Sequence, residues 1–163
     1  MEASTSCSGA KICRCPARRR APVTALTSAL KAGALRDLGA CETLEREADI
    51  PKRAFDVVLD LLGGPRWSER IDALGEGGRY VCAGAMAGPI VELDLRPLYL
   101  RDPIFFGCTY QRDNIFTDLV RHIEAGELRP ILAGTHSLRE LRAAQARFMS
   151  NSHVGKEGIL LGS

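Results

Sequence analysis

The sequence predicts an α/β protein built on a parallel sheet, and three observations support this class. Two near-continuous apolar runs, at 55–62 and 80–83, enclose a helical stretch in which Trp67, Ile71 and Leu74 are spaced to face one side. Strands that are buried on both faces lose their polar alternation, so this pattern is typical of a strand–helix–strand crossover. Strand-like and helix-like segments also alternate along almost the whole chain, which favours the α/β class.

The segments before the crossover continue this alternation. Residues 23–27 form a short β-branched run that predicts a strand, and Ser28 is the candidate N-cap of a helix that Gly39 ends. The acidic segment 42–49 is expected to be a connector. Residues 1–20 are small and basic and offer almost nothing to bury, so we expect a disordered leader there.

After the crossover, the sequence predicts three more helices and two more strands. A short helix is expected at 97–102, followed by a buried strand at 103–109 and an amphipathic helix. Residues 129–132 are expected to be an extended link. Ser137 and Glu140 form a capping box at the start of the last helix. A final apolar run at the C-terminus predicts a closing strand.

Glycines mark the ends of the two crossover strands. One apolar run stops at Gly63 and the other at Gly84, and Gly75 is expected to end the intervening helix in a left-handed cap. Parallel strands meet at one edge of the sheet, where ligands bind in open α/β sheets, and glycine lets a ligand approach the backbone. The alternative interpretation is ordinary strand-to-loop punctuation. Asp60, inside the first run, is expected to bond a neighbouring backbone amide.

Composition limits the range of functions. The chain has 163 residues, 45 % of them hydrophobic, and a net charge of +2, which suits one globular domain with a tail and argues against nucleic-acid or membrane partners. No apolar run approaches the roughly 20 residues of a membrane span. We expect a cytoplasmic protein.

The cysteines and histidines show no metal-ligand pattern. Cys82 and Cys108 lie in apolar runs and are expected to be buried, while the spacing of Cys7, Cys13 and Cys15 matches no common zinc arrangement. No pair of histidines has ligand spacing. A reducing cytosol fits this cysteine usage best.

Several motifs occur in an order and spacing that are specific only when taken together. They are VTALTSALK, LRDLGA, FDVVLDLLGG, LGEGGRYVCAG, FFGC, LVRHIEAGELRP, HSLRELRAAQARFMS and HVGK. From about Val23 to Leu161 the chain thereby resembles the cofactor-binding half of the medium-chain dehydrogenase/reductases. The branch it looks most like is the zinc-independent quinone oxidoreductases and their zinc-binding dehydrogenase relatives.

The resemblance implies an incomplete Rossmann-type, doubly wound parallel sheet that lacks the first strand and the glycine-rich loop. No G-x-G-x-x-G loop, which would hold the pyrophosphate of the cofactor, precedes Val23. The expected domains are a basic leader at 1–20, a partial cofactor-binding domain at 21–134, and a C-terminal helix and strand at 135–163 that would pack on the missing catalytic domain.

The function that the resemblance implies is hydride transfer between NADP(H) and a quinone, enone, carbonyl or alcohol. The enzyme is expected to be truncated at its N-terminus and weakly active or inactive, with its catalytic residues unknown. The alternatives are a non-catalytic remnant or association module, and a different nucleotide binder such as a methyltransferase, against which the FFGC and HVGK motifs argue.

The residues Thr27, Ser28 and Lys31 stand where the resemblance places the adenosine ribose. No acid follows until Asp37, so a hydroxyl and a lysine favour NADP(H), while NAD(H) stays open. Alternatively, Ser28 only caps the helix and Lys31 is solvated.

The resemblance also implies that the backbones of three strand ends flank the cofactor. These residues are Leu61, Leu62, Gly63, Ala83, Gly84, Ala85, Phe105, Phe106 and Gly107. Lys156 would meet the pyrophosphate, or is simply a surface lysine. No zinc is expected in this chain. The expected partners are a small carbonyl or quinone substrate and a second copy, joined through the edge strand at 104–107.

Overall fold

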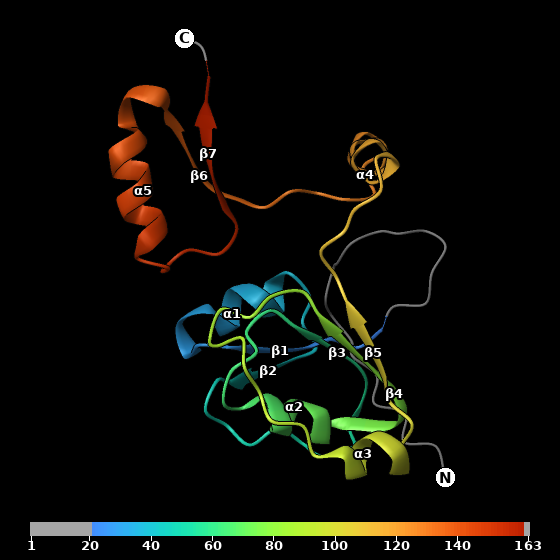
Figure 1. Ribbon diagram of the computed structural model, residues 1–163. Helices are drawn as coiled ribbons and strands as arrows, with labels where there is room; N and C mark the ends of the chain where they lie inside the picture. Colours follow the sequence, from blue (N-terminus) through green and yellow to red (C-terminus); the bar gives the residue numbers. More distant parts are fainter. Residues whose placement is uncertain (1–20, 162–163) are drawn as a thin grey trace. The chain divides into compact units, whose positions relative to one another are not determined.

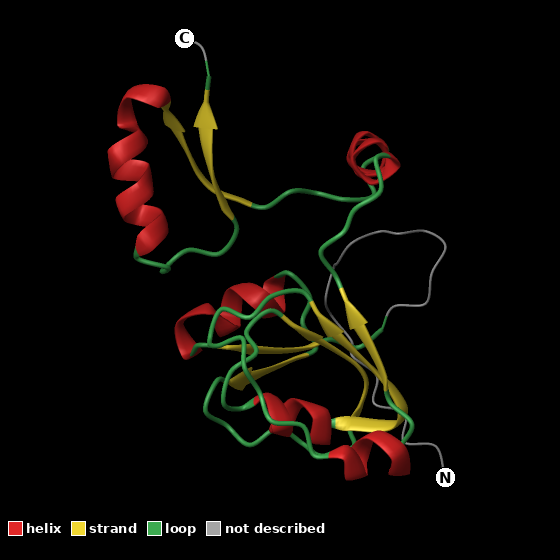
Figure 2. Ribbon diagram, in the orientation of Figure 1, coloured by secondary structure: helices red, strands yellow, loops and turns green. Residues whose placement is uncertain are grey.

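The computed structural model describes residues 21–161, which form mixed α/β structure with parallel strands (Figure 1, Figure 2). The expected leader at 1–20 lies outside the described residues. In chain order the elements are β1 (Thr24–Thr27), α1 (Ala29–Asp37), β2 (Glu42–Glu45), β3 (Phe55–Asp60), α2 (Trp67–Asp72), β4 (Leu74–Cys82), α3 (Leu95–Leu100), β5 (Ile104–Gly107), α4 (Asn114–Glu124), β6 (Leu132–Ser137), the 3₁₀ turn η1 (Leu138–Glu140), α5 (Leu141–Met149) and β7 (Lys156–Leu160).

These elements belong to two compact units. One contains residues 49–112, and the other contains the described residues before 49 together with those from 113 onward. The α/β fold with parallel sheets that the sequence predicted is confirmed, whereas the domain boundaries at 20 and 134 stay a prediction. None of the helices described here has both the length and the apolar character needed to cross a membrane.

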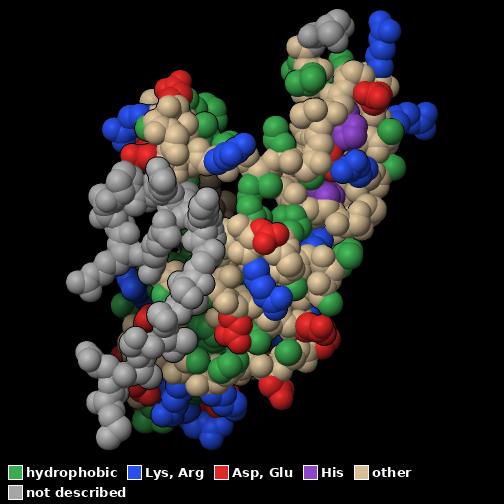
Figure 3. All heavy atoms as spheres, turned by 180° about the vertical axis from the view of Figure 1, so that it is seen from behind, with side chains coloured by type: hydrophobic (Ala, Val, Ile, Leu, Met, Phe, Trp, Pro, Cys, Tyr) green, Lys and Arg blue, Asp and Glu red, His purple; other side chains and the backbone are tan. Residues whose placement is uncertain are grey.

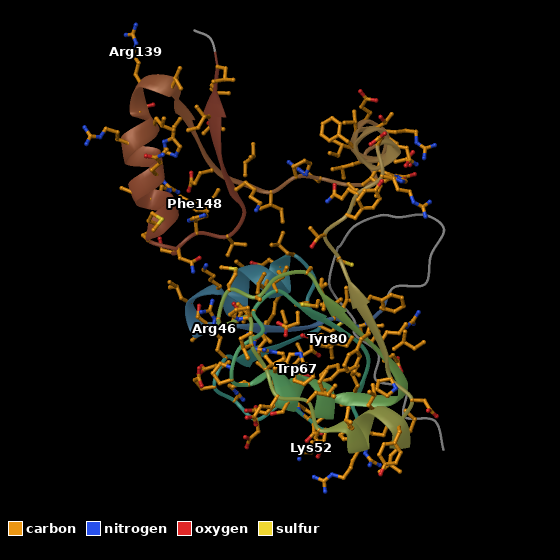
Figure 4. The ribbon with its side chains drawn as sticks, in the orientation of Figure 1. Arg46, Lys52, Trp67, Tyr80, Arg139 and Phe148 are labelled. Carbon is orange, nitrogen blue, oxygen red and sulfur yellow. The ribbon has the colours of Figure 1, made fainter. Side chains whose placement is uncertain are left out.

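The unit at 49–112 is built on a parallel sheet in the order β3-β4-β5. Tyr80 pairs with Val58 on one side and with Phe105 on the other, so these side chains share one face. Helix α2 covers this face with Trp67 and Ile71. Trp67 meets Tyr80 edge to face at 5.9 Å, and both are labelled in Figure 4.

The start of β4 is fixed by a buried arginine. Arg101, which is 8 % exposed, donates from Nη1 to the Leu74 carbonyl oxygen at 3.2 Å and from Nη2 to a carboxylate oxygen of Asp72 at 3.1 Å. Leu74 is itself 1 % exposed. The helix-to-strand corner is therefore held by packing on one side and by a charged side chain on the other.

The other unit contains two parallel pairs, β1-β2 and β6-β7. Helix α1 packs on the first pair and α5 on the second. The predicted capping box is confirmed, with Ser137 and Glu140 bonded in both directions at η1. Asp113 stands at the N-cap position of α4, but its side chain makes no capping hydrogen bond.

Two strands were missed from the sequence. The acidic segment at 42–49 is not only a connector, because β2 pairs in parallel with β1 while Glu42 and Glu45 point to solvent. The link at 129–132 runs into β6, which pairs with β7. Tertiary pairing overrode the weak strand propensity of both segments.

Three further expectations were wrong. The crossover helix ends at Asp72 rather than Gly75, because Leu74 already pairs with Phe55, and Gly77 has the positive φ of 65° instead. The strand expected at 103–109 lies at the sheet edge as predicted, as β5 beside β4, but its residues are exposed rather than buried. Cys108, which follows it, is exposed for the same reason, while Cys82 is half-buried.

Candidate functional site

The carboxyl ends of three strands lie at one edge of the β3-β4-β5 sheet. Asp60 pairs with Cys82, and Cys82 pairs with Gly107. Beyond these pairs, the Ala83 amide donates to the Asp60 carbonyl oxygen at 2.8 Å, and the Cys108 amide donates to the Cys82 carbonyl oxygen at 2.9 Å. The structure therefore brings together the three strand-end segments that the sequence singled out.

The two segments that follow β3 and β4, residues 61–64 and 84–88, form what we call the strand-end loop pair. The Ala87 amide donates to the Leu62 carbonyl oxygen at 2.8 Å, and the Gly64 amide donates to the Gly88 carbonyl oxygen at 3.0 Å. A Cβ on Gly63 would lie 2.8 Å from the Gly88 carbonyl oxygen. Glycine is required here because the two loop backbones approach each other.

The second segment of the loop pair, residues 84–88, begins with two backbone donors that are unused within the described residues. Across the described part of the chain, the amides of Gly84 and Ala85 have no hydrogen-bond acceptor, whereas those of Leu62, Gly63 and Ala87 all have one. Two successive free amides at the carboxyl end of a parallel strand can donate to oxygens of a bound ligand.

A buried carboxylate anchors the first loop. Asp60 is 3 % exposed, and its Oδ1 accepts hydrogen bonds from the Leu62 amide at 2.8 Å and the Gly63 amide at 3.2 Å. The expectation that Asp60 bonds a neighbouring amide is confirmed. Its Oδ2 accepts from the Tyr80 hydroxyl at 2.6 Å and from Arg70 Nη1 at 3.2 Å.

The same set of bonds sets the ionisation of Asp60. Burial alone would raise the pKa of its carboxyl, but the hydrogen bonds from Tyr80, Leu62 and Gly63 and the charge of Arg70 outweigh burial and lower that pKa. Burial, and then the bond to Asp60, raise the pKa of the Tyr80 hydroxyl. At neutral pH the cluster therefore holds a carboxylate, a neutral phenol and a guanidinium.

Arg70 connects this cluster back to the loop. It is 9 % exposed, and the Nη1 that meets Asp60 also donates to the Gly63 carbonyl oxygen at 2.6 Å. Both backbone polar groups of Gly63 are thus bound to buried side chains. We call Asp60, Arg70 and Tyr80 the Asp60 cluster.

A cavity of about 420 Å³ opens beside the loop pair. It extends from Gly64 and Pro65 past the indole of Trp67 to the segment before α3. Its remaining lining residues are Ser68, Ile90, Val91, Glu92 and Asp94.

Comparison with known proteins places this geometry in a family. The model of a zinc-binding dehydrogenase domain matches residues 38–157. The chain belongs to the zinc-binding dehydrogenases. This assignment confirms the resemblance to the medium-chain dehydrogenase/reductases that the sequence showed.

Individual relatives support this assignment. Acryloyl-coenzyme A reductase of Sulfurisphaera tokodaii is 29 % identical over 108 residues, which cover 64 % of this chain and 32 % of that protein. A thermostable alcohol dehydrogenase of Pyrobaculum aerophilum, solved with cobalt and zinc, is 37 % identical with a TM-score of 0.72, covering 85 % of this chain and 42 % of that one. A candidate alcohol dehydrogenase of Sinorhizobium meliloti 1021 is 36 % identical with a TM-score of 0.75, covering 84 % and 40 %.

The chain spans about a third to two fifths of the length of these relatives. The same fold also occurs in a Bacillus subtilis protein solved with NAD bound and a mycobacterial protein complexed with NADPH, at 21 % and 19 % identity and TM-scores of 0.72 and 0.64.

The residues predicted to contact the adenosine ribose lie in the other unit of this zinc-binding dehydrogenase chain. Thr27 is buried at the end of β1, and Ser28 stands at the N-cap position of α1 without a side-chain capping bond. Lys31 Nζ donates to Asn151 Oδ1 at 2.9 Å on the surface. The missed strand β2 puts Glu45 in register with Thr27, so an acid does neighbour this strand end.

Lys156 is the first residue of β7, with its side chain exposed and its amide bonded to the Ile131 carbonyl oxygen at 2.9 Å. Because it lies in a different unit from the strand-end loop pair, its predicted contact with the pyrophosphate stays a prediction, as do the cofactor contacts of the other candidate residues.

A second buried carboxylate was not anticipated from the sequence. The side chain of Glu157 on β7 is 4 % exposed. His136 Nε2 lies 2.8 Å from its Oε2, and Arg147 Nε lies 2.9 Å from its Oε1. His153 Nδ1 is buried 3.9 Å from Oε1 and has no hydrogen-bond partner among residues 21–161. Histidine side chains are visible near basic side chains on the face in Figure 3. The members come from positions 136, 147, 153 and 157, and no local motif links them.

The family description raises the question of a zinc ion. Within residues 21–161 no three His, Cys, Asp or Glu side chains form a group that could hold a metal. Both carboxylate oxygens of Glu157 already have partners. Oε2 is paired with His136, and Oε1 is paired with Arg147 and lies near His153. The described residues do not fit a zinc ion, and no step is assigned to one.

Proposed function

We propose that this chain forms the cofactor-binding half of an oxidoreductase that transfers hydride between NADP(H) and a small carbonyl, enone, quinone or alcohol. The observation that carries the proposal is the meeting of three strand ends at one sheet edge, with the free amides of Gly84 and Ala85 beside them, in a zinc-binding dehydrogenase. The cofactor supplies the hydride when bound. The chain contributes one wall of the cofactor site, with backbone amides that can donate hydrogen bonds and hydrophobic side chains of the sheet behind them.

The substrate class rests on the relatives. One is named for acryloyl-coenzyme A, whose alkene is conjugated to a thioester, and another is an alcohol dehydrogenase. The first name describes reduction of an alkene conjugated to a carbonyl, and the second describes interconversion of an alcohol and a carbonyl, so we infer a substrate of one of these kinds. Catalytic residues are not assigned to this chain. That it is truncated, weakly active and cytoplasmic, with domain boundaries at 20 and 134, stays a prediction.

The direct test is an NMR titration of the ¹⁵N-labelled 163-residue chain with NADPH, with ATP as the control ligand. We expect saturable shifts of the Gly84 and Ala85 amides with a dissociation constant near the millimolar range. The sequence has no G-x-G-x-x-G loop, and each lost charge-assisted bond weakens binding by about 1.5–3 kcal/mol. Shifts that are equal for ATP and NADPH, or absent, would support the alternative of a non-catalytic remnant or association module.

The preference for NADP(H) rests on Lys31, whose ammonium is on the surface near the end of β1. Glu45 beside Thr27 acts against it, because a carboxylate repels a 2′-phosphate. We expect Lys31→Ala to lower the NADPH-to-NADH affinity ratio and Glu45→Gln to raise it. The exposed Lys52→Ala is the matched control, since Lys52 lies in the other unit. Equal ratios in all four proteins would show that neither residue meets the ribose.

A homodimer through β5 is the proposed assembly. β5 pairs with β4 on one side, and its four residues are exposed, so it offers an edge to a second copy. Phe105 is unsuited to the test because its ring meets Tyr80 at 5.4 Å and Trp67 at 6.1 Å. Phe106, on the opposite face, is 46 % exposed, so Phe106→Lys should shift sedimentation from dimer to monomer at micromolar concentration. A wild-type monomer would rule out this assembly.

A further inference from the structure

The carboxyl end of β3 is held more firmly than a strand-to-loop turn requires. Two buried side chains, Asp60 and Arg70, bind a turn of two left-handed glycines, Gly63 at φ 59° and Gly64 at φ 77°. A third buried side chain, Tyr80 of β4, binds Asp60. Glycine by itself leaves such a turn many conformations, so the side chains that bind it select one of them.

The buried side chains bind both the amide and the carbonyl oxygen of Gly63. Asp60 Oδ1 accepts the Leu62 and Gly63 amides, and Arg70 donates to the Gly63 carbonyl oxygen. Asp60, Arg70 and Tyr80 are 3 %, 9 % and 3 % exposed, so water competes little for these bonds. In such surroundings hydrogen bonds to charged groups are strong and mutually reinforcing.

The fixed turn in turn fixes the second loop. Three backbone hydrogen bonds join the two loops. The Met86 amide donates to the Leu61 carbonyl oxygen at 3.4 Å and the Ala87 amide to the Leu62 carbonyl oxygen at 2.8 Å, while the Gly64 amide donates to the Gly88 carbonyl oxygen at 3.0 Å. Gly84 also packs directly on the first loop, because a Cβ there would lie 2.7 Å from the Leu61 carbonyl oxygen. The orientation of the free Gly84 and Ala85 amides thus depends on the turn at 61–64.

We propose that Asp60, Arg70 and Tyr80 are positioning residues of the cofactor site, which order the strand-end loop pair and thereby set its affinity for the nicotinamide cofactor. The proposal rests on the proposed function, since it takes the loop pair to be the wall of that site. None of the three side chains needs to touch the ligand, because their effect passes through the loop backbone.

The first measurement tests the ordering of the loops without any cofactor. Hydrogen exchange of the Leu62 and Gly63 amides is compared between the wild-type chain and Asp60→Asn, which keeps the side-chain shape but removes the charge. We expect exchange at these amides to accelerate on the order of tenfold relative to the Val58 amide in β3. Unchanged relative exchange would overturn the proposal.

The second measurement uses NADPH and NADH. The dissociation constants of Asp60→Asn, from the Ala85 amide shift, are expected to rise on the order of tenfold. Ile71→Val is the matched control, because Ile71 packs in the hydrophobic cluster that includes Tyr80 but makes none of the polar contacts of the Asp60 cluster. If both variants lose affinity only in proportion to their lost thermal stability, the cluster is merely structural and the proposal fails.

Two further variants keep the test decisive if Asp60→Asn does not fold. Tyr80→Phe removes only the hydroxyl and should give a smaller change in the same direction. Arg70→Lys retains a cation that can reach Asp60 and should recover part of the affinity that Arg70→Met loses. If the wild-type chain binds neither cofactor, the proposed function and the affinity half of this proposal fall together, while the exchange rates still decide whether the cluster orders the turn.

Discussion

Two regions of this molecule are organised around a buried carboxylate, and they use it differently. In the unit at 49–112, Oδ1 of Asp60 accepts hydrogen bonds from two backbone amides and Oδ2 accepts from two side chains. Glu157, in the C-terminal β6–α5–β7 region, meets only side chains: His136, Arg147 and, at a longer distance, His153.

The difference shows what each carboxylate can control. A carboxylate that binds amides fixes the course of the backbone, and here that backbone forms the wall of the candidate site. A carboxylate that pairs with side chains joins elements, because His136, Arg147 and Glu157 come from β6, α5 and β7. The side chain of Arg147 is 52 % exposed and can return to water if the pair is broken, whereas the side chain of Arg70 is buried and cannot.

The largest expected effect is therefore that of Asp60→Ala. This substitution leaves the Arg70 guanidinium buried and unpaired, which typically destabilises a protein by about 3–5 kcal/mol. Urea unfolding followed by fluorescence of Trp67, the only tryptophan in the sequence, measures the loss in this unit. Glu76→Ala, which breaks an exposed pair with Arg53 in the same unit, should change stability by less than about 1 kcal/mol. Equal effects for the two variants would contradict the distinction drawn here.

The next effect tests whether the glycine turn needs its backbone shape. Gly63→Ala puts a Cβ 2.8 Å from the Gly88 carbonyl oxygen at a positive φ, so we expect a loss of about 1–3 kcal/mol. Gly33 is the opposite case: it lies inside α1 with nothing within 4 Å of an added Cβ. Gly33→Ala should raise the thermal midpoint slightly, since alanine favours a helix by about 0.5–1 kcal/mol over glycine. A tolerated Gly63→Ala would mean that the loop pair is looser than its contacts indicate.

Substitution of the second carboxylate should have a smaller effect. In Glu157→Ala the half-exposed Arg147 side chain regains water, so we expect a lower unfolding midpoint for β6–β7 but a smaller shift than for Asp60→Ala. Exchange of the Ile159 amide in β7 measures it locally, with Trp67 fluorescence as the unaffected control. A larger loss for Glu157→Ala than for Asp60→Ala would reverse the comparison.

The sequence predicted what depends on local pattern. The crossover from β3 to β4, the capping box at Ser137 and the bond from Asp60 to a neighbouring amide all involve residues a few positions apart, where periodicity and side-chain chemistry are sufficient. Family motifs then supplied the parallel order that brings the strand ends together. The three strand-end segments that hold most of the candidate residues accordingly lie at one sheet edge.

The features that the sequence did not predict depend on distant partners. β2 looked like an acidic connector because only its pairing with β1 makes it a strand, and that pairing also sets Glu45 beside Thr27. The Glu157 cluster joins four residues that no motif relates. The strand-end glycines were read as places for a ligand, yet Gly63 and Gly64 are required by the close approach of Gly88 and Ala87.

The smallest expected effect is the loss of stability at acid pH, which should begin at a different pH for each of the two carboxylates. Both pKa values are lowered from ordinary values of 3.8 for Asp60 and 4.5 for Glu157. For Asp60 the bonds from Tyr80, Leu62 and Gly63 overcome the opposing effect of burial; for Glu157 the bond from His136 acts first, against burial, with help from Arg147 and His153.

A carboxyl with a lowered folded-state pKa contributes stability that is present above its ordinary pKa and is lost as the pH falls through the lowered one. We therefore expect the contributions of the two carboxylates to decline below about pH 4.5 for Glu157 and below about pH 4 for Asp60. Urea midpoints taken every half pH unit, with Trp67 reporting on one unit and the Ile159 amide on the other, follow the two declines separately. Asp60→Asn should flatten only the Trp67 curve and Glu157→Gln only the Ile159 curve; if either variant flattened both, the two carboxylates would stabilise a single cooperative structure rather than two regions.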